Sequence, residues 1–181
     1  MNVGNRDTEN EILISLFYQV VNPLHRRRKL LIGSINMSKK KVIDAIETHK
    51  VFAIVRGLHP TKISATMEAL YKGGIRLVEV TFDRQQGDAD TLAALKILQN
   101  EFTGKLIYGA GTVTNIEQVA QVKALGAQFI VSPNCNVDVI AATNNAEMVS
   151  LPAALTPTEA LVAHNAGADF VKLFPGGVFG P

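Results

Sequence analysis

The chain has 181 residues, 47% of them hydrophobic and 19% charged, which is typical of a globular protein with one good core. No stretch approaches the ~20 apolar residues of a transmembrane helix, so we predict no membrane association. The single Cys135 excludes an intramolecular disulfide and suits a reducing compartment. Residues 1–41 hold eight of the 18 basic and three of the 16 acidic residues. The remainder therefore carries ten basic and thirteen acidic residues, a balance that predicts no nucleic-acid surface.

The first 36 residues differ from the rest of the chain. An apolar run at residues 12–17 is followed by the basic cluster of residues 26–29, the reverse of the order in a signal peptide. That cluster could contact nucleic acid or membrane, but so short a charge run is usually only solvated. Met37, followed by Ser-Lys-Lys-Lys, is a natural start for a bacterial enzyme. We interpret residues 1–36 as a disordered extension or upstream sequence, and residues 37–181 as the folded domain.

From residue 42 onward one unit recurs: an apolar strand, a polar or glycine-rich turn, an amphipathic helix and a glycine. Two stretches, Thr114–Glu117 and Thr156–Glu159, have the pattern of capping boxes that begin helices. Glycines near residues 74, 126 and 167 are typical of helix ends. The spacing between strands is typical of βαβ units rather than hairpins. The predicted strands are residues 51–56, 77–82, 106–109, 129–132, 148–151 and 170–174.

Six alternating units predict a parallel sheet covered by helices. A doubly wound sheet is one alternative. We favour a (β/α)8 barrel of the TIM type, because polar residues gather where the predicted strands end, the position of active sites in such barrels. Six of eight units would make an incomplete barrel, either completed by another chain or truncated. The strand-end polar residues are Arg56, Glu79, Thr81, Thr112, Ser132, Asn134 and Lys172.

Two charged residues fall on inward faces of predicted strands. Glu79 alternates with Val78 and Val80, which would pack on helices and leave the carboxyl group inside. Lys172 shares one face of a short, buried strand with the phenylalanines on either side of it, at residues 170 and 174. Desolvation there favours the neutral amine that Schiff-base chemistry requires. Two alternatives stay open: an ion pair between Glu79 and Lys172 or Arg56 that only satisfies buried charge, or a lysine whose ammonium group reaches water.

The region from about residue 41 to residue 181 resembles the 2-keto-3-deoxy-6-phosphogluconate / 4-hydroxy-2-oxoglutarate aldolases, which are bacterial class I pyruvate aldolases. Motifs that follow the predicted strands in order carry the resemblance. They are Phe-Ala-Ile-Val-Arg at 52–56, Gly-Ile-Arg-Leu-Val-Glu-Val-Thr at 74–81, Gly-Ala-Gly-Thr-Val at 109–113, Val-Ser-Pro-Asn at 131–134 and Phe-Val-Lys-Leu-Phe-Pro at 170–175.

The resemblance implies roles for particular residues. Lys172 would form an imine with the C2 ketone of a keto acid, and Glu79 would shuttle protons through a water molecule. The imine is the electron sink, so no metal or other cofactor is implied. The pyruvyl end would be lined by Arg56, Thr112 and Pro133, with Arg56 gripping the carboxylate. Phe174 would wall the pocket and help keep Lys172 neutral. The implied protein is a cytoplasmic homotrimer whose partners are a keto-acid substrate and pyruvate.

Two positions depart from the family pattern. Asp83, followed by Arg84, stands where many members have an arginine, and Gly176 stands where serine or alanine is commoner. The seventh and eighth units, which hold the phosphate site in the family, are not represented in the chain. Two alternatives to an active aldolase therefore stay open: a catalytically silent fragment, and a phosphosugar isomerase or epimerase on the same scaffold.

Overall fold

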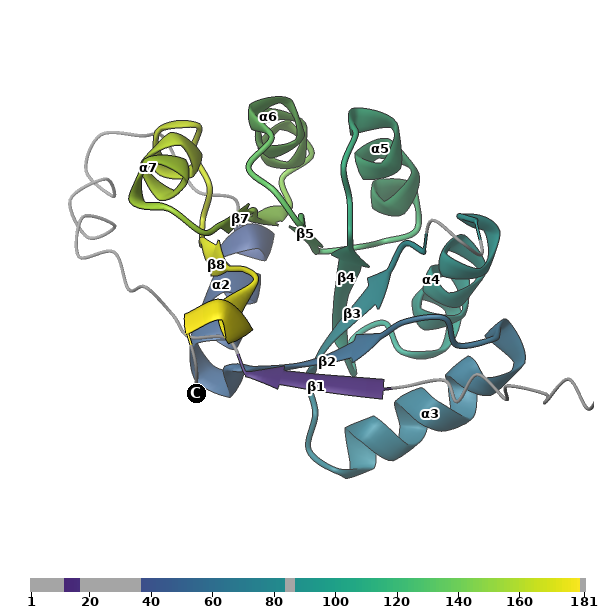
Figure 1. Ribbon diagram of the computed structural model, residues 1–181. Helices are drawn as coiled ribbons and strands as arrows, with labels where there is room; N and C mark the ends of the chain where they lie inside the picture. Colours follow the sequence, from purple (N-terminus) through teal and green to yellow (C-terminus); the bar gives the residue numbers. More distant parts are fainter. Residues whose placement is uncertain (1–11, 17–36, 84–86, 180–181) are drawn as a thin grey trace, which may run out of the picture.

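The computed structural model describes residues 12–16, 37–83 and 87–179. Strands and helices alternate along most of the chain, as the recurring unit predicts (Figure 1). In chain order the elements are β1 (Ile12–Leu16), α2 (Met37–His49), β2 (Val51–Val55), α3 (Pro60–Lys72), β3 (Leu77–Thr81), α4 (Ala89–Glu101), β4 (Ile107–Gly111), α5 (Ile116–Ala124), β5 (Phe129–Val131), α6 (Val137–Asn145), β6 (Val149–Leu151), β7 (Ala153–Ala154), α7 (Pro157–Asn165), β8 (Lys172–Leu173) and the 3₁₀ helix η1 (Gly176–Phe179).

The sheet has the order β1-β2-β3-β4-β5-β6, and its strands β2 to β6 are parallel. The short pair β7-β8 is also parallel. Figure 1 shows the sheet curving, with α3 to α7 on its outer side and α2 on the other side. This is the α/β fold of the TIM-barrel type that the sequence predicts. It brings the carboxyl ends of β2 to β6 to one edge.

The predicted inward and outward faces are confirmed by the packing. On the inner face Phe52, Leu77 and Phe129 form one buried cluster with Val42, Ile43 and Ile46 of α2. The rings of Phe52 and Phe129 meet edge to face, with centroids 5.2 Å apart. On the outer face Val78 and Val80 pack in a separate, larger cluster with residues of the surrounding helices. Glu79 therefore points to the inside of the curved sheet, above a core that α2 closes.

The helix caps follow the sequence with one correction. Thr156 caps α7 in a complete capping box with Glu159, as predicted. The cap of α5 is Asn115, whose side chain accepts a hydrogen bond from the Gln118 N–H, so the predicted capping box at Thr114 was wrong by one residue. Thr114 instead donates its backbone N–H to the Gln118 side chain.

The strand near Lys172 differs from the prediction. The strand predicted at residues 148–151 is confirmed as β6, which ends before Pro152, a residue with no N–H to donate; the additional short strand β7 follows. The predicted buried strand at 170–174 is reduced to the two residues of β8, of which Leu173 is 41% exposed. The burial prediction was wrong because, within the described residues, β8 pairs with β7 alone.

Strand β1 was not predicted. It pairs antiparallel with β2, from Ile12 opposite Val55 to Leu16 opposite Val51, and so covers the edge of the parallel sheet. The interpretation of residues 1–36 as an extension otherwise concerns residues outside the described ranges, and it stays a prediction.

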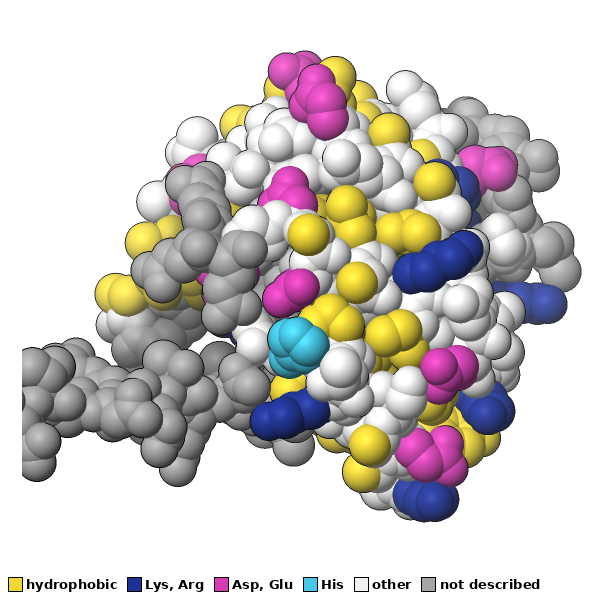
Figure 2. All heavy atoms as spheres, turned by 90° about the vertical axis from the view of Figure 1, so that its right-hand side faces the viewer, with side chains coloured by type: hydrophobic (Ala, Val, Ile, Leu, Met, Phe, Trp, Pro, Cys, Tyr) yellow, Lys and Arg dark blue, Asp and Glu magenta, His cyan; other side chains and the backbone are white. Residues whose placement is uncertain are grey.

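The helical outer surface has the character of a solvent-facing layer. Figure 2, which looks at the right-hand side of Figure 1, shows Lys and Arg side chains interspersed with Asp and Glu rather than gathered into one patch of a single sign. Within the described residues, no helix has both the length and the apolar character needed to cross a membrane.

Candidate active site

The predicted site residues come from several strands of the fold. Glu79 lies within β3 and Lys172 begins β8. Arg56 follows β2 directly, and Thr112 follows β4. Pro133, which comes two residues after β5, is half-buried. Parallel pairing of β2 to β6 places the carboxyl ends of these strands at a common edge, so Arg56, Thr112 and Pro133 share one end of the sheet, whereas β8 pairs with β7 outside it.

Glu79 is the most perturbed of these groups. Its side chain is only 2% exposed, and its Oε2 has no hydrogen-bond partner within the described residues. Burial raises the pKa of the Glu79 carboxyl group to about 7, against the opposing attraction of Lys172 and then of Arg56. A carboxyl group that gains and loses a proton near neutral pH is suited to general acid–base work.

Gly111 makes room for the Glu79 side chain, a role that the sequence did not reveal. A Cβ atom at residue 111 would lie 1.8 Å from the Glu79 Oε1, and 2.5 Å from the carboxyl carbon. Any larger residue there would therefore displace the carboxyl group. The glycine stands in the Gly-Ala-Gly-Thr-Val motif, but its contact is with a residue on another strand, which the motif alone does not indicate.

Lys172 lies in the same electrostatic environment. Burial lowers the pKa of the Lys172 amine from its ordinary value; the Glu79 carboxylate opposes this shift, and Arg56 adds to it. A lowered pKa increases the fraction of neutral, nucleophilic amine. Each of the two residues expected to carry the chemistry thus alters the pKa of the other.

Phe174 contacts the Lys172 amine. The Lys172 Nζ lies 4.4 Å from the centroid of the Phe174 ring, a cation–π geometry that favours the charged form. Phe174 is also 42% exposed. Its predicted place as a wall beside Lys172 fits this contact. Burial is the largest cause of the lowered pKa of Lys172, and the predicted contribution of Phe174 to it stays a prediction.

Arg56 and Thr112 meet across the strand ends. The Arg56 Nη2 donates a hydrogen bond of 3.3 Å to the Thr112 Oγ1, although the two residues are 56 positions apart. Thr112 has a φ of 59°, a left-handed conformation that is unusual for a β-branched residue. Such strain is common at ligand sites. The exposed Arg56 guanidinium is an available partner for a substrate carboxylate.

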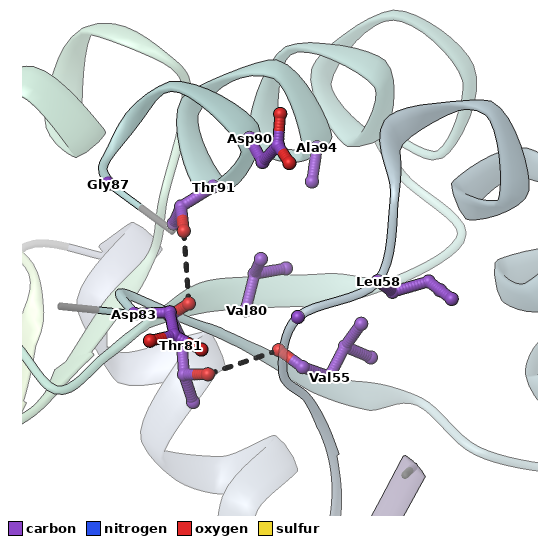
Figure 3. A pocket seen from close by; sticks show the side chains of 10 residues that line it. Val55, Leu58, Val80, Thr81, Asp83, Gly87, Asp90, Thr91 and Ala94 are labelled. Carbon is purple, nitrogen blue, oxygen red and sulfur yellow. Dashed lines mark hydrogen bonds between the residues drawn. The ribbon is translucent and has the colours of Figure 1, made fainter. Parts of the chain in front are cut away.

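A second set of contacts fixes the backbone just behind the site (Figure 3). The Thr81 Oγ1 donates to the Val55 carbonyl at 3.3 Å, and the Thr91 Oγ1 donates to the Thr81 carbonyl at 3.0 Å. These bonds tie the ends of β2 and β3 to α4 beside a small hollow that Asp83 also lines. Lys172 and Glu79 do not line this hollow.

The sequence also singles out Arg84, Gly176 and Cys135. Arg84 lies outside the described residues. Gly176 begins η1, where an added Cβ atom would meet nothing within 4 Å. Burial, with a smaller effect of Glu159, raises the pKa of the Cys135 thiol, which disfavours a thiolate nucleophile. In the part of the chain that the structure describes, no group of three or more His, Cys, Asp or Glu side chains could hold a metal ion.

The arrangement defines a class: a TIM-barrel type protein whose strand ends bring a lysine amine with a lowered pKa beside a buried carboxyl group. The family model described as "KDPG and KHG aldolase" matches residues 42–181. A protein of Rhizobium meliloti named "Probable 2-dehydro-3-deoxy-6-phosphogalactonate aldolase" is 37% identical over 131 residues, which cover 72% of this chain and 60% of the relative. The chain belongs to the KDPG and KHG aldolase family.

Solved structures agree with this assignment. A structure described as "Native KDPGal structure" matches with a TM-score of 0.66 and 33% identity, over 72% of this chain and 61% of the other. The KDPG aldolase of Legionella pneumophila, solved with pyruvate captured as a covalent carbinolamine intermediate, matches with a TM-score of 0.58 and 28% identity, over 64% and 54% of the two chains. The chain thus spans roughly 60% of the length of the first relative it matches.

Proposed function

We propose that this chain supplies the imine-forming part of a class I aldolase, which cleaves a 2-keto-3-deoxy sugar acid to pyruvate and an aldehyde. The observation that carries the proposal is the buried Glu79 carboxyl group, 2% exposed and accommodated by Gly111, whose pKa the Lys172 amine alters and which alters that of the amine in turn. Related proteins carry names of aldolases acting on phosphorylated sugar acids, which supports this substrate class.

The proposed reaction begins with attack of the neutral Lys172 amine on the C2 ketone. The resulting carbinolamine loses water to give an imine, and Glu79 donates the proton that leaves with that water. Glu79, now ionised, takes the proton of the C4 hydroxyl; the C4 carbonyl forms as the C3–C4 bond breaks, its electron pair moves into the imine, the aldehyde departs and an enamine remains. Protonation of the enamine and hydrolysis of the imine release pyruvate and restore the amine. Glu79, with a pKa of about 7, can serve in both directions of proton transfer.

The substrate would be held by groups at the strand ends. The Arg56 guanidinium, steadied by the Thr112 hydroxyl, would grip the carboxylate next to the ketone. Pro133 and Phe174 would bound the pyruvyl end. The assembly that the family resemblance implies is a homotrimer, and sedimentation velocity of the expressed chain tests that part of the proposal.

Borohydride reduction in the presence of pyruvate tests the proposed imine. Mass spectrometry should find a reduced pyruvate adduct on the peptide that contains Lys172, and Lys172→Ala should abolish it. Lys105→Ala is the matched control, because Lys105 also lies over a phenylalanine ring, 5.5 Å from the Phe102 centroid, but is exposed to solvent. Absence of any adduct in the wild-type chain would refute the proposal.

A thermal melt and a phosphosugar turnover assay, run beside the trapping experiment, separate the two alternatives. A catalytically silent fragment, unstable alone, would form no adduct and would aggregate instead of melting cooperatively. An isomerase or epimerase would turn over a phosphosugar without a trappable imine.

A further inference from the structure

Lys39 of α2 makes an ion pair with the segment that leads into β8. The Lys39 Nζ lies 2.9 Å from the Asp169 Oδ2 and donates a second bond, of 2.8 Å, to the Asn144 Oδ1. The two charged side chains are only 14% and 11% exposed. Charges so far removed from water are stable when paired, and removing one partner leaves the other uncompensated. The pair is thus a specific connection across the fold, between residues 130 positions apart in sequence.

Asp169 is in turn hydrogen-bonded to β6 of the sheet. Its Oδ2 accepts the backbone N–H of Ser150 at 2.8 Å, and the Ser150 carbonyl accepts the backbone N–H groups of both Asp169 and Phe170 at 3.1 Å. Ser150 is the central residue of β6 and is 2% exposed. Asp169 therefore binds the sheet through its side chain and its backbone together.

Lys172 follows three residues later on a short and weakly paired strand. Its backbone N–H donates to the Pro152 carbonyl at 2.9 Å, beside the break between β6 and β7. Within the described residues, β8 has β7 as its one neighbouring strand, and its second residue is 41% exposed. Because β8 itself is held on one side, the place of the Lys172 amine depends on how firmly the residues before it are anchored.

We propose that Lys39 is a positioning residue for Lys172: its ion pair with Asp169 anchors the start of the β8 segment to β6, and so holds the Lys172 amine beside Glu79 of β3 and Arg56 at the end of β2. The catalytic significance of this anchoring rests on the proposed aldolase function. The anchoring itself does not.

The test measures the Lys172 amine without a substrate. The full chain is acetylated with trace acetic anhydride across a range of pH, and mass spectrometry gives the labelling midpoint of Lys172. In Lys39→Met, water should reach the Lys172 amine, and its labelling midpoint should rise by about one pH unit. At a pH below the midpoint, this rise makes the neutral fraction of the amine about tenfold smaller. Lys39→Arg keeps the positive charge and should restore the wild-type midpoint.

Lys40→Met is the matched control. Lys40 is the next residue of α2 and pairs with Asp44 of the same helix, so its loss should leave the Lys172 midpoint unchanged. If Lys39→Met fails to fold, Asp169→Asn replaces it, since the amide oxygen can still accept the Ser150 N–H while the charge is lost. An unchanged midpoint in Lys39→Met or Asp169→Asn would overturn the proposal, as would a shift that Lys39→Arg does not reverse.

Borohydride trapping on the same samples separates this proposal from the proposed function. A shifted midpoint in Lys39→Met, together with a wild-type chain that forms no pyruvate adduct, would sustain the anchoring and refute the aldolase. A pyruvate adduct in the wild type, together with an identical Lys172 midpoint in every variant, would support the aldolase and refute the anchoring.

Discussion

Replacing Glu79 with glutamine should remove a pH dependence from the stability of the chain. In the folded state the pKa of Glu79 is raised from 4.5 to about 7, so between these values the folded chain binds more protons than the unfolded one. By linkage, the contribution of Glu79 to the free energy of unfolding is fully present below pH 4.5 and is lost as the pH rises through about 7. The shift corresponds to about 3 kcal/mol.

The measurement is urea denaturation of the wild type and Glu79→Gln at pH 4.5 and pH 8. The stability difference between the two proteins should move by about 3 kcal/mol in favour of Glu79→Gln at the higher pH. With a denaturant slope of about 2 kcal/mol/M, the wild-type midpoint should fall by about 1.5 M relative to that of the variant. Costs of the amide group that do not depend on pH cancel in this comparison.

Glu47→Gln is the control for a general effect of removing a carboxylate, because Glu47 is exposed on α2. Its stability should stay within about 0.5 kcal/mol of the wild type at both pH values. If wild type and Glu79→Gln lose stability in parallel between pH 4.5 and pH 8, Glu79 does not hold a proton in the folded chain. That result would refute the general acid–base role that we infer from the burial of Glu79.

Two further substitutions test the packing around the site. Gly111→Ala should displace the Glu79 carboxyl group and lower the free energy of unfolding, measured by urea titration, by about 1–3 kcal/mol. Gly176→Ala is the control and should be nearly neutral, because residue 176 has open space around it. Equal effects of the two substitutions would contradict the contact between Gly111 and Glu79. Thr156→Ala should remove the cap of α7, reduce the free energy of unfolding by about 1 kcal/mol and so lower the thermal midpoint. Thr158→Ala, at an exposed position of the same helix, should leave the midpoint unchanged. Equal midpoints of the two variants would argue against the capping box.

Features that depend on a few neighbouring residues could be predicted from the sequence. The alternation around Glu79 predicts its inward face because side chains alternate along any strand, whatever lies opposite. The spacing from Thr156 to Glu159 predicts a capping box because its hydrogen bonds close within four residues. The strand–helix period likewise predicts a parallel sheet covered by helices. The sequence placed Lys172 on a strand, but it could not show that this strand would be short and half-exposed, since that depends on its neighbours in the sheet.

The tertiary structure alone decided how distant residues meet. Gly111 makes room for Glu79, and Thr112 reaches Arg56, because parallel pairing sets β2, β3 and β4 side by side. The ion pair of Lys39 with Asp169 forms when the first helix of the domain closes the inner core, and no local pattern marks either residue as a partner of the other. A sequence determines which groups it carries and which face each one presents. The folded chain determines which groups lose their water together, and that loss sets the pKa of Glu79 and of Lys172.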